Sequence, residues 1–447
     1  MIRMAVCALF LLGLIAATVV RVVALWPQPT PVETPEQLIP ISGSVSSDHL
    51  QSISTSVELL ERLEPRFQRA FDDYEALLLR GLLLFQAGKI DEALSQLKSL
   101  TRVAPRFELA HLVYGDLLLA RFAPLATIGS AAPTGPDDAN RQQRLEELRS
   151  EARARLQGYV SLLNSDRVPA SLIALGENTP YALVIDKSKN RLYVFSNQGV
   201  GAVPQLIDDF YIVLGQKIGD KMVEGDLRTP TGTYFVTSYL APEILPPLYG
   251  SGAFPINYPN EYDRRQQKTG FGIWLHGTDR SLFSRPPLDS EGCVVLTNEE
   301  FERIRQYVVI GRTPVIISEE LEWIAKNDWR EQKSAINMVI QQWRQHWEGG
   351  DLKSYLDMYS RDFWSSQHDY DSWGAYKGQV FAGKTYQQIT FSDLSLYGYP
   401  SDDDAAPLVV ATFVQHYRSN NFNGDMRKRL YLIKEQDQWK VVYEGRQ

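Results

Sequence analysis

The sequence predicts a multidomain α+β protein with an N-terminal membrane segment, a helical domain, a mostly antiparallel β domain and a C-terminal α+β cone. Three observations lead to this prediction. The 447 residues suffice for roughly three domains of ~150 residues each. The spacing of apolar residues changes from three and four residues to two at Tyr181. The last stretch of the chain then reads as one helix followed by several strands.

The composition excludes several classes of protein. Hydrophobic residues make up 44% of the chain and charged residues 22%, which rules out wholesale disorder, collagen-like repeats and a polytopic membrane protein. The net charge of -8 gives no general attraction to phosphates, so no nucleic acid partner is expected. The two cysteines are Cys7, in an apolar N-terminal run, and the isolated Cys293, so no disulfide framework is expected.

The N-terminus carries an export signal. Residues 4–20 form a run of 17 residues without a charge, between Arg3 and Arg21. The run lacks a clear small-x-small cleavage site, which favours an uncleaved anchor over residues 1–26. A cleaved leader and a buried core helix are the alternatives. Five prolines between Pro27 and Pro40 favour an extended linker over residues 27–49, so the body of the chain is expected outside the cytoplasm.

Residues 50–165 are expected to form a helical domain, because their apolar residues recur at three- and four-residue spacing. Gly81 and Gly115 lie 34 residues apart, with Ala93 and Pro105 between them at offsets similar to those of tetratricopeptide repeats. Fewer than three repeats are recognisable, so an ordinary helical bundle is the alternative. A repeat module of this kind usually offers a packing surface or a surface for a partner, here an envelope protein.

The β domain is expected over residues 178–320, and the cone over residues 333–447. Residues 181–196 read as a β-hairpin around a KSKN turn, and later strand-like segments are separated by Gly- and Pro-rich loops. One helix interrupts them, and Thr297 and Glu300 predict a capping box at its start. The cone is predicted by the helical segment SAINMVIQQWRQHW followed by the strand segments PLVVATFVQHY, KRLYLIKEQ and QWKVVYEG.

Two residues of the β domain carry candidate chemistry. His276 ends an apolar strand, and Cys293 follows Gly292 at the start of another strand. A thiol after a tight glycine turn can face a cleft beside backbone N–H groups, and a neighbouring imidazole can take its proton, as nucleophilic acyl transfer requires. The alternative is a buried hydrophobic Cys293 and a structural His276. Export weakens that alternative, because a free thiol outside the cytoplasm is prone to oxidation.

The motifs around this pair resemble the YkuD-type catalytic domain of the L,D-transpeptidases, which remodel bacterial peptidoglycan. The resemblance covers about residues 181–318 and rests on several motifs in the family's order. They are GQKIGDK at 215–221, GD at 225–226, TPTG at 229–232, HGT at 276–278 and SEGC at 290–293.

The resemblance implies a role for each matching residue. Cys293 is the expected nucleophile and His276 its general base. The carbonyl of Gly277 is expected to orient the imidazole, and the amides around Gly292 and Cys293 to form an oxyanion hole. The implied reaction is attack on the carbonyl of the third stem residue, usually diaminopimelate, with release of the terminal D-Ala. Transfer to an amine gives transpeptidation, and transfer to water gives L,D-carboxypeptidation. No cofactor is implied.

The sequence departs from the family at two positions. Many members have SHGC followed by Ile or Val and then Arg, whereas here Glu291 replaces the His and Val295 replaces the Arg. A group that helps bind an anionic stem is therefore missing. Arg285 or Arg280, in the loop between His276 and Cys293, is the hypothesised substitute, with a solvated loop charge as the alternative for each. The other expected substrate contacts are Thr278, Ser290 and Glu291.

The C-terminal cone resembles the SnoaL-like or nuclear-transport-factor-like fold. In that combination the chain is similar to the cell-shape-determining L,D-carboxypeptidases of helical bacteria. The resemblance implies a periplasmic enzyme, anchored in the inner membrane or secreted if the leader is cleaved, that acts on peptidoglycan stem peptides. Aromatic residues of the cone either line a sugar or peptide pocket or form its core. His346, His368 and His416 lack metal-ligand spacing, so no metal site is expected.

A non-catalytic peptidoglycan-binding or scaffold protein of the cell envelope is the alternative function from another class. In that reading the helical and cone domains act, and the β domain only recognises stem peptides. The intact His276 and Cys293 pair favours an enzyme, because a scaffold would be free to lose either residue. Release of a wall-linked protein also fits the chemistry of the pair.

Overall fold

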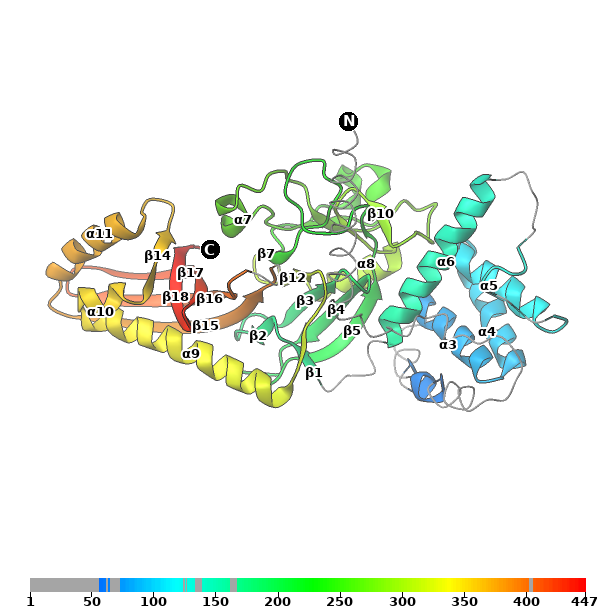
Figure 1. Cartoon of the computed structure of the whole chain (residues 1–447), viewed down its shortest axis with the longest axis horizontal. Coiled ribbons are helices and arrows are strands. Elements are labelled where there is room, and N and C mark those ends of the chain that lie inside the picture. Colours follow the sequence, from blue (N-terminus) through cyan, green and yellow to red (C-terminus); the bar gives the residue numbers. More distant parts are fainter. Residues whose placement is uncertain are drawn as a thin grey trace, which may run out of the picture.

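The computed structural model describes residues 56–61, 63–64, 73–123, 125, 127–132, 139–160, 167–401 and 405–447. The predicted anchor (1–26) and linker (27–49) lie outside these residues. None of the described helices combines the length and the apolar character needed to cross a bilayer. Three bodies follow one another along the long axis of the molecule, from the blue and cyan helices through the green central domain to the yellow and red C-terminal domain (Figure 1).

The N-terminal body is helical: residues 56–61 and 63–64 are in helical conformation, and they are followed by α3 (Tyr74–Gln86), α4 (Ile90–Val103), α5 (Glu108–Leu119) and α6 (Ala139–Val160). The turn between α3 and α4 uses Gly88 at a φ of 76°. Gly81 on α3 lets the two helices pack closely, because a Cβ at this position would stand 2.7 Å from Cγ of Leu97 on α4. This contact gives a physical reason for the first of the two glycines of the predicted repeat. The tetratricopeptide-like assignment itself stays a prediction.

The central domain contains a five-stranded sheet of order β5-β4-β3-β12-β7. All neighbouring pairs are antiparallel except β3 and β12. The predicted hairpin over 181–196 is confirmed as β3 and β4. The strands of this sheet are β3 (Tyr181–Asp186), β4 (Arg191–Ser196), β5 (Gln205–Tyr211), β7 (Gly232–Phe235) and β12 (Pro314–Ser318).

Two smaller sheets complete the central domain, with strand orders β11-β9-β8 and β10-β6. The β11–β9 and β10–β6 pairs are parallel, unlike most of the main sheet. Their strands are β6 (Leu214–Gly215), β8 (Ala253–Pro255), β9 (Trp274–His276), β10 (Leu288–Ser290) and β11 (Val294–Val295). The domain also holds 3-10 helices η2 (Pro242–Ile244) and η3 (Pro247–Tyr249), and helices α7 (Glu261–Arg265) and α8 (Asn298–Arg305). The predicted capping box of Thr297 and Glu300 is confirmed at the start of α8.

The C-terminal domain is a six-stranded sheet of order β14-β18-β17-β16-β15-β2, partly wrapped by three helices. Its last strand, β2 (Leu172–Ala174), comes from the segment between the helical and central domains, and β1 (Arg167–Pro169) pairs with β13 (Trp323–Ala325). The remaining elements are α9 (Lys326–Gly349), α10 (Leu352–Leu356), β14 (Tyr359–Trp364), α11 (Tyr370–Ala382), β15 (Gln387–Tyr399), β16 (Leu408–Ser419), β17 (Asn423–Glu435) and β18 (Gln438–Arg446).

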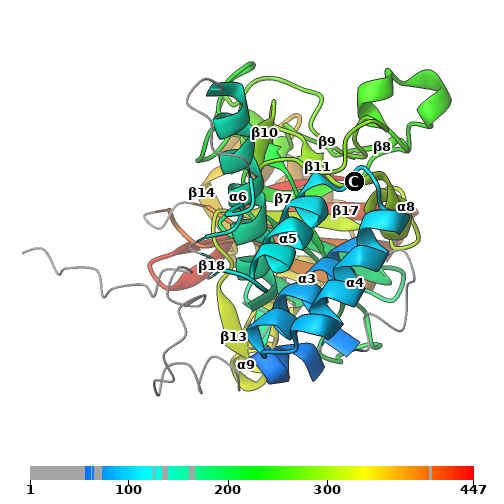
Figure 2. The same cartoon turned by 90° about the vertical axis from the view of Figure 1, so that its right-hand side faces the viewer.

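Buried ionic contacts fix the helical domain to the central domain, whose sheets lie behind it in Figure 2. Glu75 of α3 accepts hydrogen bonds from Arg191 of β4 at 2.8 and 2.9 Å, and from Arg155 of α6 at 3.0 Å. Arg191 also donates to Asp209 of β5 at 2.6 Å. These groups are almost fully buried. Breaking one partner of such a network leaves an uncompensated buried charge, so the two domains are held in a fixed arrangement.

A buried lysine marks the interior of the C-terminal domain. The Nζ atom of Lys377 on α11 lies 4.3, 4.6 and 5.1 Å from the ring centroids of Trp347, Trp373 and Tyr355. Burial lowers the pKa of Lys377 to about 7. Attraction between the ammonium group and the three rings offsets only part of the free energy that the group loses when it leaves water.

We expect replacing Lys377 by methionine to stabilise the protein by about 1–4 kcal/mol at pH 6, because it removes a buried charge and keeps the length of the side chain. The unfolded chain holds this proton up to about pH 10.5, whereas the folded chain releases it near pH 7. The wild type should therefore gain stability from pH 7 to 10.5, and the variant should lose that part of the gain. Thermal unfolding at pH 6 and pH 9 tests this, with exposed Lys353→Met as the control. An unchanged melting temperature of Lys377→Met at pH 6 would contradict it.

Candidate active site

The pairing of β9 with β11 places His276 and Cys293 on one face of a sheet. In this parallel pair Val294 lies opposite Leu275, and Val295 lies opposite His276. Leu275 and Val294 both point into the hydrophobic core of the domain. Since side chains alternate along a strand, His276 and Cys293 both project from the opposite face. The register thus places the two predicted catalytic residues on the same face of neighbouring strands.

The imidazole of His276 is held in one orientation. Its Nδ1 atom lies 2.5 Å from the carbonyl oxygen of Gly277. A carbonyl can only accept, so Nδ1 carries the hydrogen, and Nε2 of the neutral ring is the atom that can take a proton. Burial lowers the pKa of His276 to about 4, the Gly277 hydrogen bond opposes this, and the charge of Arg285 lowers it further. The ring is therefore neutral at physiological pH.

The thiol of Cys293 is also neutral in the resting site. Its Sγ atom donates to the carbonyl of Gly272 at 3.4 Å. Burial raises the pKa of Cys293 to about 11, and the exposed carboxylate of Glu291 adds to the increase, against the backbone of Trp274 and the charge of Lys221. A thiol with this pKa needs a base to remove its proton during attack.

Ser290 and Gly292 shape the turn that presents the thiol. The Ser290 hydroxyl donates to the carbonyl of Cys293 at 2.7 Å and accepts from the amide of Gly292 at 3.2 Å. Gly292 has a φ of 128°, and a Cβ there would stand 2.7 Å from the carbonyl oxygen of Arg228. Ser290, which the sequence predicts as a substrate contact, is buried within the turn. The Gly292 amide, expected in an oxyanion hole, is engaged by Ser290 in this structure.

The motifs at 215–221, 225–226 and 229–232 pack against this turn. The Thr229 hydroxyl accepts from the amide of Gly215 at 2.9 Å, and a Cβ on Gly215 would stand 2.5 Å from the carbonyl oxygen of Leu227. Asp226 accepts from Nζ of Lys221 at 2.8 Å and from three backbone amides. Burial opposes the ionised form of Asp226, but these hydrogen bonds lower its pKa to about 2. Thr229 and Asp226 thus fix the backbone around Arg228, against which Gly292 packs.

The two arginines expected to bind substrate, Arg285 and Arg280, lie in different surroundings in the loop between His276 and Cys293. Arg285 donates to the side chain and backbone of Asp289 at 2.8 and 2.7 Å, and to the hydroxyl of buried Thr278 at 3.4 Å. It therefore lies close enough to His276 for its charge to act on the imidazole, and it is paired with Asp289. Arg280 is exposed, and its carbonyl accepts from Arg106 of the helical domain. The described contacts do not bring Arg280 to the catalytic pair.

Sequence reasoning missed Tyr249 and Asn298. The ring of Tyr249, at the end of η3, meets His276 edge-on at 4.9 Å and lies 4.9 Å from Trp274. Asn298 accepts from the amide of Ser251 and donates to the carbonyl of Thr278, both at 2.8 Å, so it ties two loops of the site to the start of α8. The glycines at 250 and 277 are the one sequence signal of these contacts, since a Cβ at either would stand less than 3.0 Å from Asn298 Oδ1.

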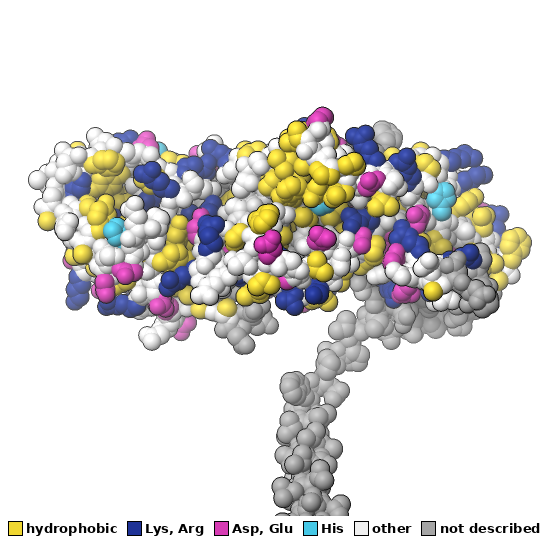
Figure 3. All heavy atoms as spheres, turned by 90° about the horizontal axis from the view of Figure 1, so that it is seen from above, with side chains coloured by type: hydrophobic (Ala, Val, Ile, Leu, Met, Phe, Trp, Pro, Cys, Tyr) yellow, Lys and Arg dark blue, Asp and Glu magenta, His cyan; other side chains and the backbone are white. Residues whose placement is uncertain are grey.

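Apolar side chains gather on the exposed surface of the central domain (Figure 3). Exposed apolar residues of this domain lie in the loops around residues 218–223, 241–250 and 270–272, of which the second carries Tyr249 and the third carries Gly272. Phe271 is 76% exposed and Ile244 is 71% exposed. The other exposed apolar residues of these loops are Ile218, Met222, Val223 and Leu248.

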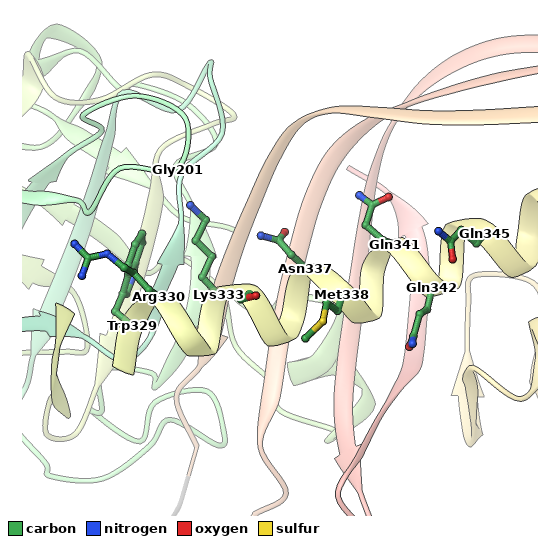
Figure 4. Close-up of a pocket in the computed structure, with 10 residues that line it drawn as sticks. Gly201, Trp329, Arg330, Lys333, Asn337, Met338, Gln341, Gln342 and Gln345 are labelled. Carbon is green, nitrogen blue, oxygen red and sulfur yellow. The ribbon is translucent and has the colours of Figure 1, made fainter. Parts of the chain in front are cut away.

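A separate groove of about 570 Å³ runs along α9 (Figure 4). It contains none of the residues of the catalytic pair or its loops. Its lining is Gly201, Trp329, Arg330, Lys333, Ser334, Asn337, Met338, Gln341, Gln342 and Gln345. Within the part of the chain that the structure describes, no three His, Cys, Asp or Glu side chains converge in a way that could hold a metal ion. His416 instead contacts Asp425 and Ser392.

Comparison with known families assigns this arrangement to a class. Residues 180–317 match the L,D-transpeptidase catalytic domain, YkuD, and residues 335–445 match the Cds6 C-terminal NTF2-like domain. The chain therefore combines a YkuD domain with an NTF2-like domain, and the resemblance predicted from the motifs is confirmed. None of the curated proteins matches the chain.

Solved structures with the same architecture include two proteins. Bd1075 of Bdellovibrio bacteriovorus is 29% identical with a TM-score of 0.55, over 63% of this chain and 98% of that one. The helical cell shape determining protein Pgp2 of Campylobacter jejuni is 27% identical with a TM-score of 0.53, over 62% of this chain and 95% of that one. A point variant of Pgp2 is 25% identical with a TM-score of 0.53, over 66% of this chain and 99% of that one.

The raised pKa of Cys293 predicts how the thiol reacts with an alkylating agent. With a pKa of about 11, the thiolate fraction rises about tenfold per pH unit through neutrality, so the alkylation rate should do the same from pH 7 to pH 10. Iodoacetamide labelling, followed by mass spectrometry of the peptide that contains Cys293, measures this rate separately from Cys7. A rate that levels off by pH 7 would instead indicate a preformed thiolate–imidazolium pair.

Glu291 is expected to suppress the reactivity of the thiol. We expect Glu291→Gln to speed alkylation at pH 8 by about two- to fivefold, because an exposed charge near the thiol is worth about 1 kcal/mol or less in water. Glu302→Gln, on the exposed surface of α8, is the matched control and should react like the wild type. Equal rates for the two variants would show that Glu291 has no electrostatic effect on Cys293.

Proposed function

We propose that this protein is a cysteine-dependent peptidoglycan enzyme of the L,D-transpeptidase class, acting on stem peptides outside the cytoplasm. The observation that carries the proposal is the placement of the Cys293 thiol and the His276 ring on one face of paired strands, within a domain that matches YkuD. Similarity to a helical cell shape determining protein supports a role in peptidoglycan and cell shape.

The site supports a two-step acyl transfer. As Sγ of Cys293 attacks the carbonyl of the third stem residue, its proton passes to Nε2 of His276. The C–N bond to the terminal D-Ala then breaks, and the imidazolium gives its proton to the departing amine. The thioester reacts next with water, which yields a tripeptide, or with an amine, which yields a crosslink or an attached protein. The same histidine takes the proton of the incoming water or amine.

Two neutral partners suit this mechanism. Burial keeps the thiol protonated and the imidazole unprotonated, so the proton moves only when substrate is in place. Activity should fall as the pH falls through about 4, where His276 takes up a proton before the substrate arrives.

Glu291 takes part in choosing the substrate. Its carboxylate is exposed beside the thiol, where many relatives carry a histidine, and diaminopimelate presents a side-chain ammonium group. Pairing of the ammonium with Glu291 would neutralise the charge that raises the pKa of Cys293, so a correct substrate would also make the thiol easier to ionise. Arg285, beside His276, is proposed to bind a carboxylate of the stem.

The location of the protein and the partners of its helical domain remain proposals of the same kind. The apolar N-terminal run supports an anchor in the inner membrane with the enzyme in the periplasm. The helical N-terminal body supports a surface for an envelope protein.

Digestion of purified tetrapeptide muropeptides tests the function. We expect the wild type to release D-Ala and leave tripeptide, or to form heavier crosslinked products, and Cys293→Ala to do neither. His276→Gln, which keeps a polar side chain but not the base, should be at least about 100-fold slower. Mass spectrometry of the products measures both reactions. An unchanged substrate with the folded wild type, or equal turnover by Cys293→Ala, would favour the non-catalytic scaffold.

A further inference from the structure

The loop that follows the strand of His276 and leads to β10 is docked on the helical domain. This loop, residues 279–286, lies between His276 and Cys293 in the sequence. The ring of Phe283 at its centre packs 4.4 Å from the ring of Phe107 and 5.7 Å from that of Tyr74, measured between centroids. Both partners belong to the helical domain, and Phe283 packs against the hydrophobic core of that domain. Phe283 therefore serves as an apolar anchor that leaves its own domain.

Polar contacts hold the same loop at the same place. The hydroxyl of Ser284 accepts from the amide of Leu109 on α5 at 3.2 Å, and its carbonyl accepts from Arg144 on α6 at 3.1 Å. Ser284 is only 2% exposed. Arg106, before α5, donates to the carbonyl of Arg280. The docked part of the loop thus contacts α3, α5 and α6.

Arg285 directly follows the docked residues Phe283 and Ser284, and its side chain points back toward His276. Tyr211 of β5 donates to the carbonyl of Arg285 at 2.9 Å. The guanidinium group bonds to Thr278 and Asp289, and its positive charge acts on His276. The position of Arg285 is consequently set from both sides: by the helical domain before it and by the central domain after it.

The helical domain provides a rigid reference for this loop. The buried contacts of Glu75 with Arg191 and Arg155 join it to the main sheet. Arg303 of α8 pairs with Asp73 at the start of α3, at 3.1 Å. None of these contacts involves Phe283, so they hold the domain even when the contacts of Phe283 are lost.

We propose that the helical domain is a positioning element for catalysis, which sets Arg285 beside His276 through Phe283 and Ser284. The proposal rests on the proposed function for the role of Arg285, but the positioning itself is a property of the folded chain. Phe283 and Ser284 touch neither the thiol nor the imidazole in the described contacts, and act through Arg285.

The decisive variant is Phe283→Ala in the full-length protein, with Leu282→Ala as the matched control. Leu282 is the preceding residue of the same loop and is 45% exposed. We expect Phe283→Ala to lower kcat/KM for the tetrapeptide muropeptide by about 10- to 100-fold, because small misplacements at an active site have effects of this size. Leu282→Ala should match the wild type. Phe283→Ala should also change kcat and KM in the same proportion as Arg285→Ala does. The double variant should be no slower than Arg285→Ala alone.

A readout without substrate separates this proposal from the proposed function. The titration of His276 can be followed by NMR in protein with labelled histidine, with His276→Gln identifying its signal among six histidines. The titratable or charged groups around His276 are Arg285, Tyr249 of η3 and Cys293 of the neighbouring strand. We expect the pKa of His276 to move upward from about 4 in both Arg285→Ala and Phe283→Ala, because the nearby positive charge is removed or displaced. Leu282→Ala should leave it unchanged.

The outcomes are distinct. If the wild type fails to turn over muropeptides but Phe283→Ala moves the His276 titration, the proposed function is wrong and the positioning stands. If Phe283→Ala and Leu282→Ala titrate alike, the positioning is wrong. Should Phe283→Ala fail to fold, Arg106→Ala decides, since this exposed residue supports the loop through the carbonyl of Arg280 and through its charge, which acts on Asp279. An unchanged His276 titration in folded Arg106→Ala would then overturn the proposal.

Discussion

The register of two short parallel strands is the constraint on which the site depends. With Val295 opposite His276, the thiol and the imidazole emerge from one face, and their neighbours Val294 and Leu275 enter the core. A slip by one residue would turn Cys293 into the core and Val294 out of it. Burial of those two apolar side chains therefore fixes the geometry of the reactive pair, and the chemistry depends on ordinary hydrophobic packing.

This packing also has an electrostatic consequence, which concerns the pKa values of Cys293 and His276. The same desolvation acts on both reactive groups in opposite senses, since it raises the pKa of an acid that ionises to an anion and lowers that of a base that ionises to a cation. The result is a pair of neutral partners without an ion pair between them. Under the proposed function, the nucleophile would stay protonated until a substrate supplies the remaining interactions, and a protonated thiol oxidises less readily.

The sequence predicted the parts of the site that are local. The strand before His276, the glycine before Cys293, the hairpin at 181–196 and the capping box at Thr297 all depend on neighbouring residues. It could not predict that Gly292 rests on the carbonyl of Arg228, that Tyr249 meets the imidazole or that Asn298 joins two loops, because these contacts link distant segments through backbone shape. For the same reason the sequence did not predict that the Ser290 hydroxyl closes its own turn, and its role as a substrate contact stays a prediction.

The short strand β2 has a consequence for how this chain can be divided. It precedes the catalytic domain in the sequence, yet it covers β15 at the edge of the C-terminal sheet. Both ends of the catalytic domain are thus tied to that sheet, one through β2 and the other through α9. A cut between residues 174 and 181 would remove β2 and bare the backbone groups of β15 near Leu396 and Tyr397, where they could pair with another chain. The two domains should therefore be expressed and crystallised as a single unit that includes β2.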